Sequence, residues 1–220
     1  MKVHVELDGG LLADRFGKYA SEPDRLEGFP VRSFPIEISD VPQEARTLAL
    51  TFIDFDAIPV GGFCWIHWTA CNLPATTTLI PEDASRTGAV AMVQGRNSNW
   101  SPMAHGSDNP QVHSRYCGPQ PPDATHSYTL NVYALDCELG LPEGFYLNEL
   151  RRAMDGHVLD QASLELPSRA WEGAVHGLYI RFVREILTGM KRILWFGAMR
   201  SSAAGGVFYN DGYAIGRLSS

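Results

Sequence analysis

The chain has 220 residues, of which 45% are hydrophobic and 20% are charged. This length and composition predict a folded protein with a substantial core, and they exclude extensive disorder. Lys and Arg number 18 against 25 Asp and Glu, for a formal charge of -7. The chain therefore has no general attraction to nucleic acid or to an anionic membrane surface.

The first residues do not read as a secretion signal. His4, Glu6 and Asp8 interrupt what would be the apolar core of a signal peptide. No stretch approaches the roughly 20 apolar residues that span a bilayer. We therefore expect a cytoplasmic protein with no integral membrane segment.

The cysteines show neither a CxxC pair nor the spacing of a zinc site. They are Cys64, Cys71, Cys117 and Cys137. We expect free, incidental thiols in a reducing compartment, with no bound metal and no cofactor.

Segments rich in aromatic and β-branched residues predict strands in the first two thirds of the chain. They cover residues 48–56, 63–72, 89–93 and 127–135. The loops between them are irregular and no βαβ rhythm is present, which indicates a mainly β protein, a sandwich or barrel. The long segment 94–122 is dense in Gly, Ser, Asn and Pro, as functional or mobile loops are.

Helical spacing appears late in the chain. Leu147, Leu150 and Met154 fall on one face of a predicted helix that Gly156 stops. Apolar residues at the same spacing predict a second helix over 171–189, and 208–213 reads as a hairpin turn.

The first segment with chemical interest is Asp54-Phe55-Asp56-Ala57. Residues two apart on a strand share a face, so we expect Asp54 and Asp56 to project to the same side. Taken alone, the segment also fits two solvated acids at a strand end.

The second segment is Trp65-Ile66-His67-Trp68. The two-residue period predicts Trp65 and His67 on one face and Trp68 on the other. A lone histidine in such a strand also fits a structural residue with satisfied hydrogen bonds.

The third segment runs from Gly118 to Tyr128. Its proline-rich turn, Gly118-Pro119-Gln120-Pro121-Pro122, is stiff and leads into a strand. His126 and Tyr128 should lie on the same face of that strand.

Taken together, the motifs Asp-x-Asp-Ala, Trp-x-His-Trp, Gly-Pro-x-Pro-Pro and His-x-Tyr resemble, in residues and in order, the phosphatidylethanolamine-binding protein family. The flanking residues Asn72-Leu73-Pro74 and Gly156-His157 extend the resemblance, which is strongest to the bacterial Raf-kinase-inhibitor-like branch. It covers about the first three quarters of the chain and fades after Leu166.

The resemblance implies an antiparallel, Greek-key β-sandwich with C-terminal helices and a pocket at one end. The expected ligand is a small anion or zwitterion such as phosphate or phosphorylethanolamine, and the expected role is regulation of a kinase or protease by inhibition. No catalytic residue is expected, and a homodimer is expected by analogy. The expected ligand-binding residues are Asp54, Asp56, Trp65, His67, Gly118, Pro119, His126 and Tyr128. If a histidine must be cationic to hold the anion, affinity should fall as pH rises through its titration.

Two other functions fit the sequence. Two His and two Asp are acceptable ligands for a divalent ion, so a metal-dependent hydrolase is one alternative. The other is an interaction protein that acts through its basic C-terminal extension. We divide the chain into a domain at 1–168 and an extension at 169–220, a helix and a hairpin packed on the domain or on a partner subunit.

Overall fold

A computed structural model describes residues 1–102 and 106–170. The chain divides into the units Met1–Ala174 and Val175–Ser220, and all the described residues belong to the first. The helix expected over 171–189 and the hairpin expected at 208–213 lie outside the described residues. Within the described ranges, no helix has the length and apolar character needed to cross a bilayer.

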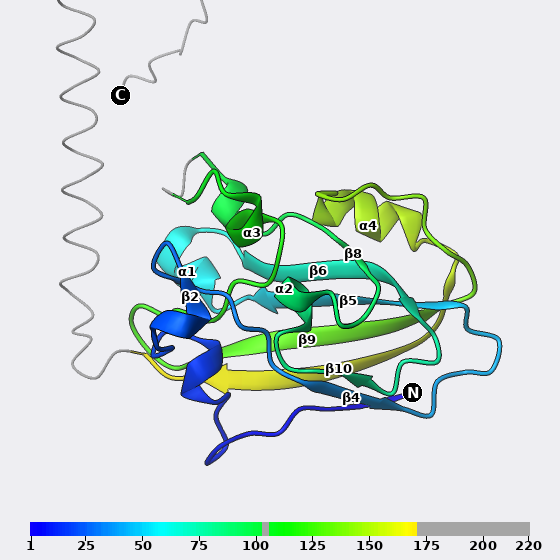
Figure 1. The fold of residues 1–220 in the computed structure, drawn as a ribbon, viewed down its shortest axis with the longest axis horizontal. Coiled ribbons are helices and arrows are strands. Elements are labelled where there is room, and N and C mark those ends of the chain that lie inside the picture. Colours follow the sequence, from blue (N-terminus) through cyan, green and yellow to red (C-terminus); the bar gives the residue numbers. More distant parts are fainter. Residues whose placement is uncertain (103–105, 171–220) are drawn as a thin grey trace, which may run out of the picture. The chain divides into compact units, whose positions relative to one another are not determined.

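The larger sheet of the described part has five strands in the order β10-β9-β5-β6-β8, all neighbours antiparallel (Figure 1). Its strands are β5 (Thr47–Asp54), β6 (Trp65–Pro74), β8 (Val93–Gln94), β9 (His126–Leu135) and β10 (Val158–Ser168). Strand β9 returns to lie beside β5 rather than beside β8, which is the Greek-key arrangement that the resemblance implies.

A smaller sheet faces the same core. It has the order β1-β4-β7, and a two-stranded ribbon joins β2 to β3. These strands are β1 (Lys2–His4), β2 (Arg25–Leu26), β3 (Phe29–Pro30), β4 (Ile36–Ser39) and β7 (Leu79–Ile80).

Helices in the described part are short. They are α1 (Ala57–Gly61), α2 (Ala84–Thr87), α3 (Pro110–His113) and α4 (Leu147–Ala153), with 3-10 turns at Asp14–Phe16, Glu22–Asp24 and Ser98–Trp100. The helix predicted before Gly156 is confirmed as α4. At its start, the side chain of Glu149 accepts a hydrogen bond of 2.7 Å from the backbone N–H of Tyr146.

The main core lies between the two sheets because alternate residues of each strand face it. Leu50 and Phe52 of β5 pack there with Leu130 of β9 and Ile36 of β4. The intervening residues of β5 face the other side of the sheet, where Ala49 packs with Leu150 and Met154 of α4. Both faces of β5 are therefore covered, and all eight of its residues are buried.

The mainly β fold class is confirmed, but two strand expectations need correction. The strand expected over 89–93 is reduced to β8, because only Val93 and Gln94 pair with β6. Strand β10 was not expected, although Ala162, Leu164 and Leu166 alternate with more exposed residues along it. As an edge strand β10 pairs on one side, with β9, and its polar residues face outward.

Candidate functional site

A chain of hydrogen bonds from Asp54 through His126 to Asp123 joins the end of β5 to the start of β9. The backbone register places Asp54, the last residue of β5, opposite Tyr128. Across this pair, Nδ1 of His126 lies 2.8 Å from Oδ2 of Asp54, and Nε2 of His126 lies 2.9 Å from Oδ1 of Asp123. The imidazole of His126 is thus held between two carboxylates, with only 4% of its side chain exposed.

One further hydrogen bond orients the side chain of Asp54. The second oxygen of Asp54, Oδ1, accepts a hydrogen bond of 3.0 Å from the backbone N–H of Ala57 at the start of α1. Each oxygen of Asp54 therefore has a hydrogen-bond partner, so the side chain cannot rotate without losing a bond.

His67 reaches the same cluster from β6. Its Nδ1 lies 2.7 Å from the carbonyl oxygen of Cys117, so the neutral ring carries its proton on Nδ1 and leaves Nε2 as an acceptor. Its ring lies against Tyr128, with centroids 5.0 Å apart, and against Phe52 at 5.8 Å.

The face assigned to Trp68 was wrong. The register of β5 and β6 shifts between Phe52 and Ile53, which pair with Trp68 and Ile66, so His67 occupies a bulge. The extra residue breaks the alternation. Trp68 therefore packs in the same core as Phe52, the residue that His67 also contacts.

Tyr128 lies among these rings with an unsatisfied hydroxyl. Its side chain is fully buried, and its hydroxyl oxygen has no hydrogen-bond partner of ordinary geometry within the described ranges. The rings of His67 and His126 have centroids 5.0 Å and 6.3 Å from that of Tyr128. As expected, His126 and Tyr128 both point to the inner face of β9.

Burial and the two carboxylates give the two histidines opposite protonation behaviour. Burial lowers the pKa of His67 to about 4, so this ring is neutral near pH 7. Burial also opposes protonation of His126, but the hydrogen bonds and charges of Asp54 and Asp123 outweigh it and raise its pKa. Burial, followed by the charge and the close approach of the Asp54 carboxylate, raises the pKa of Tyr128, which remains a phenol.

Asp56 does not join the buried cluster. Strand β5 ends at Asp54, so the two-residue alternation does not extend to Asp56, which is exposed before α1. Its Oδ2 accepts a hydrogen bond of 2.8 Å from the backbone N–H of Ser127. Asp56 thus ties α1 to the start of β9 at the outer edge of the site.

The proline-rich turn is tightly packed beside the cluster. Gly118 donates its N–H to the carbonyl of Pro30 at 2.8 Å, and a Cβ at this position would lie 2.0 Å from the carbonyl oxygen of Phe16. The next residue, Pro119, is also buried. Trp65 pairs with Asp54 across the sheet, is half-buried, and stacks on Phe63 at 6.2 Å between ring centroids.

Sequence reasoning missed two charged residues of the site. Asp123 stands three residues before His126 in the same proline-rich segment, and this spacing in a turn was the available signal. Lys18 carries no such signal, because it lies far away in sequence and donates through Nζ to the carbonyl of Pro121. Burial lowers the pKa of Lys18 to about 8, although Asp123 acts in the other direction.

The donor atoms here do not converge as metal ligands do. The two nitrogens of His126 face different carboxylates, and Nδ1 of His67 faces a backbone carbonyl. Within the described ranges, one group of side chains does bring three possible metal-ligand atoms within 4.8 Å of one another. It consists of Asp136, Cys137 and His157. It lies elsewhere in the fold.

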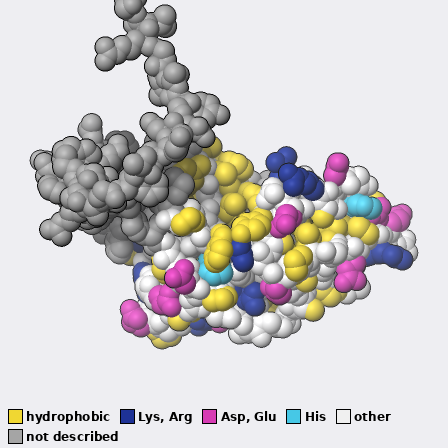
Figure 2. Space-filling view, turned by 90° about the horizontal axis from the view of Figure 1, so that it is seen from above, with side chains coloured by type: hydrophobic (Ala, Val, Ile, Leu, Met, Phe, Trp, Pro, Cys, Tyr) yellow, Lys and Arg dark blue, Asp and Glu magenta, His cyan; other side chains and the backbone are white. Residues whose placement is uncertain are grey.

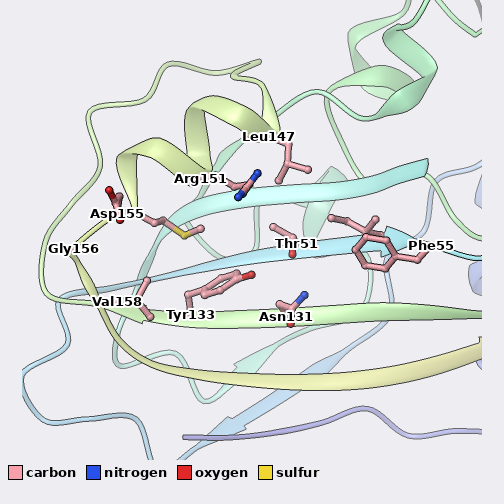
Figure 3. Close-up of a pocket in the computed structure, with 11 residues that line it drawn as sticks. Thr51, Phe55, Asn131, Tyr133, Leu147, Arg151, Asp155, Gly156 and Val158 are labelled. Carbon is pink, nitrogen blue, oxygen red and sulfur yellow. The ribbon is translucent and has the colours of Figure 1, made fainter. Parts of the chain in front are cut away.

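A cavity of about 550 Å³ lies on the outer face of the larger sheet, under α4. Thr51, Asn131 and Tyr133 rise from β5 and β9 toward Leu147 and Arg151 of α4 (Figure 3). These strand residues alternate with Phe52, Tyr128 and Leu130 of the core, so the cavity and the histidine cluster occupy opposite faces of the sheet.

The surface seen from the α3 and α4 side carries many hydrophobic side chains with scattered charges between them (Figure 2). Phe63, Trp100 and Tyr146 are among the exposed large hydrophobic residues. The guanidinium of Arg96 lies 3.8 Å from the ring centroid of Trp100 and 4.9 Å from that of Tyr146. This cation bridges two otherwise exposed rings.

Comparison with known proteins agrees with the motifs and the fold. The family model for phosphatidylethanolamine-binding protein matches residues 4–168. YxkA of Bacillus subtilis is 54% identical over 169 residues, which cover 77% of this chain and 99% of YxkA. A protein of Methanothermobacter thermautotrophicus is 31% identical, over 74% of this chain and 94% of its own length.

Two solved structures share the fold. The crystal structure of CT736 from Chlamydia trachomatis, a phosphatidylethanolamine-binding-protein homologue, has a TM-score of 0.59 and 30% identity, and the match covers 75% of this chain and 93% of CT736. Escherichia coli YbcL, described as a member of the mammalian family, has a TM-score of 0.60 at 24% identity, covering 76% and 97% of the two chains.

Proposed function

The chain belongs to the phosphatidylethanolamine-binding protein family, and we propose that its buried Asp54–His126–Tyr128 cluster binds a small anionic or zwitterionic ligand. The ligands we propose are phosphate and phosphorylethanolamine. The protein acts as a binding module rather than as an enzyme.

The unsatisfied hydroxyl of Tyr128 is the observation that carries the proposal. Leaving a buried hydroxyl without a partner costs about 1–3 kcal/mol. That cost is recovered if a ligand oxygen accepts a hydrogen bond from the hydroxyl. The high pKa of Tyr128 keeps the proton in place for this role.

The histidines supply complementary chemistry. His126, whose pKa is raised, supplies a positive charge beside the ring of Tyr128 when it is protonated, while neutral His67 presents a lone pair on Nε2. An oxyanion would lie against His126 and Tyr128. An ammonium group would be attracted by the carboxylates of Asp54 and Asp123, so a zwitterion satisfies both kinds of group.

The proposed biological use of the Asp54–His126–Tyr128 cluster is regulatory. A bound head group would control whether the protein inhibits a kinase or protease, in the cytoplasm and as a homodimer. Sedimentation of the full chain would test the dimer. Enzyme inhibition measured with and without phosphorylethanolamine would test the regulatory role.

The test of the binding proposal compares two tyrosines on one strand. Tyr128→Phe removes the buried hydroxyl, and Tyr133→Phe removes a hydroxyl on the opposite face of β9. Calorimetric titration with phosphate and with phosphorylethanolamine should show affinity reduced about 10- to 100-fold for Tyr128→Phe, as for loss of a hydrogen bond to a charged group. Tyr133→Phe should bind like the wild type.

His126→Ala provides a second variant in the same titration. It should bind neither ligand measurably, with folding checked by circular dichroism. Wild-type affinity in both Tyr128→Phe and His126→Ala would remove the proposal. Comparing the two ligands shows whether the ammonium group adds affinity to the phosphate.

A further inference from the structure

A second cluster of chemically reactive side chains lies at the other end of β9. Asp136 and Cys137 follow the last residue of β9, and His157 precedes the first residue of β10. These two strands run side by side along the sheet (Figure 1). The ten residues of β9 separate this cluster from His126 by about 30 Å, so the two sites are independent.

The backbone holds the cluster in place without help from its side chains. Asp136 donates its N–H to the carbonyl of His157 at 3.1 Å, and Leu135 pairs with Val158 in the ladder. The hydroxyl of Thr47 donates to the carbonyl of Cys137 at 2.5 Å. Substituting a cluster side chain therefore leaves these bonds intact.

Three different donor atoms meet at this point. A carboxylate oxygen of Asp136, the sulfur of Cys137 and a ring nitrogen of His157 lie within 4.8 Å of one another. Nδ1 of His157 is 2.8 Å from Oδ1 of Asp136. In a tetrahedral zinc site the ligand atoms are roughly 3.3–3.8 Å apart, so ordinary side-chain rotations would bring all three to one ion.

We propose that Asp136, Cys137 and His157 bind a divalent transition-metal ion, with Zn²⁺ as the best fit. Thiolate and imidazole together select borderline metals over Mg²⁺ and Ca²⁺, which prefer oxygen ligands. The side chains of His157 and Asp136 are 46% and 44% exposed, so an ion has access from solvent. Three protein ligands leave the fourth position to water.

Proton balance sets the conditions for binding. The thiol of Cys137 gives its proton to solvent when its sulfur takes the metal. His157 binds through Nδ1 as a neutral ring, so the proton that Nδ1 now donates to Asp136 is carried on Nε2 instead, with no net release. The charges that act on Cys137 are those of Asp136 and Arg46. Binding should therefore strengthen as pH rises.

The test is a Co²⁺ titration of the full chain after treatment with a chelator. Co²⁺ bound to a thiolate gives a charge-transfer band in the near ultraviolet, which reports the sulfur directly. We expect saturation at one ion per chain and loss of the band when Zn²⁺ is added. Cys137→Ser should abolish the band, and His157→Gln should weaken Co²⁺ binding at least about tenfold.

The matched control is Cys64→Ser, which removes another half-buried free cysteine and should leave the band unchanged. Thermal melts without metal should be alike for all variants, because the backbone bonds remain. The proposal is overturned if no charge-transfer band forms, if the band survives Cys137→Ser, or if all variants bind Co²⁺ equally, which would indicate an adventitious ion only. In the overturned case, Asp136 and His157 are only a surface pair.

Discussion

Oδ2 of Asp54 lies 2.8 Å from Nδ1 of His126, and both side chains are about 95% buried. Burial lowers the pKa of His126, but the carboxylates of Asp54 and Asp123 on the two sides of the ring together outweigh it and raise that pKa. The two carboxylates thus favour the protonated, cationic form of His126 inside the fold, although the chain as a whole is acidic.

The first prediction concerns stability above neutral pH. A raised pKa in the folded state stabilises the protein fully below the unfolded value of 6.5, and this contribution is lost as pH rises through the folded pKa of His126. Asp54→Asn should remove much of it. Urea unfolding of both proteins between about pH 6 and pH 9 should show their difference in unfolding free energy shrinking toward high pH. A constant difference would contradict the assignment.

The second prediction concerns acid. The pKa of His67 is lowered from 6.5 to about 4, so its contribution to stability is present above 6.5 and is lost as pH falls toward 4. The loss amounts to on the order of 3 kcal/mol. His67→Gln should show a smaller decline in unfolding free energy over this range than the wild type. The substitution His4→Gln, at an exposed histidine, should leave the decline in unfolding free energy the same as in the wild type.

The third prediction concerns the turn beside the site. In Gly118→Ala the new methyl group would lie 2.0 Å from the carbonyl oxygen of Phe16, so the backbone must shift. We expect a loss of about 2 kcal/mol or more in unfolding free energy. Gly140→Ala is the control, because a Cβ there meets nothing within 4 Å. Equal stability of the two variants would show that the turn can relax.

The fourth prediction concerns the unsatisfied hydroxyl of Tyr128. Without ligand, Tyr128→Phe removes an unsatisfied buried polar atom, so its unfolding free energy should equal or exceed the wild-type value by up to about 1 kcal/mol. Adding saturating phosphate should stabilise the wild type more than the variant. A clear destabilisation of the ligand-free variant would mean that the hydroxyl already has a partner.

The inner face of β9 was predictable from sequence because the strand alternates regularly. His126, Tyr128 and Leu130 are buried while the residues between them are half-buried, as the two-residue period requires. The order of the motifs also predicted the family and the sandwich. These features depend on local spacing, which a sequence displays directly.

Features that depend on interruptions of spacing were not predictable. The bulge that turns His67 and Trp68 toward one core depends on the register with β5, and the end of β5 at Asp54 separates Asp56 from the cluster. The hydrogen bond between Asp123 and His126 depends on the conformation of a proline-rich turn. Each of these requires knowing which strand lies beside which, and that information is absent from any single segment.

The last prediction concerns how the carboxylates beside His126 set the pH dependence of phosphate affinity. If His126 must be cationic to hold phosphate, affinity should fall as pH rises through the raised pKa of His126, and the neutral ring of His67 should have no part in this fall. Asp123→Asn removes one of the charges that raise this pKa, so the midpoint of the fall should move to lower pH. Titrating both proteins with phosphate at matched pH values cancels the ligand's own ionisation. An identical midpoint in the two proteins would show that Asp123 only positions the ring, and a flat profile in both would show that the charge of His126 does not bind the anion.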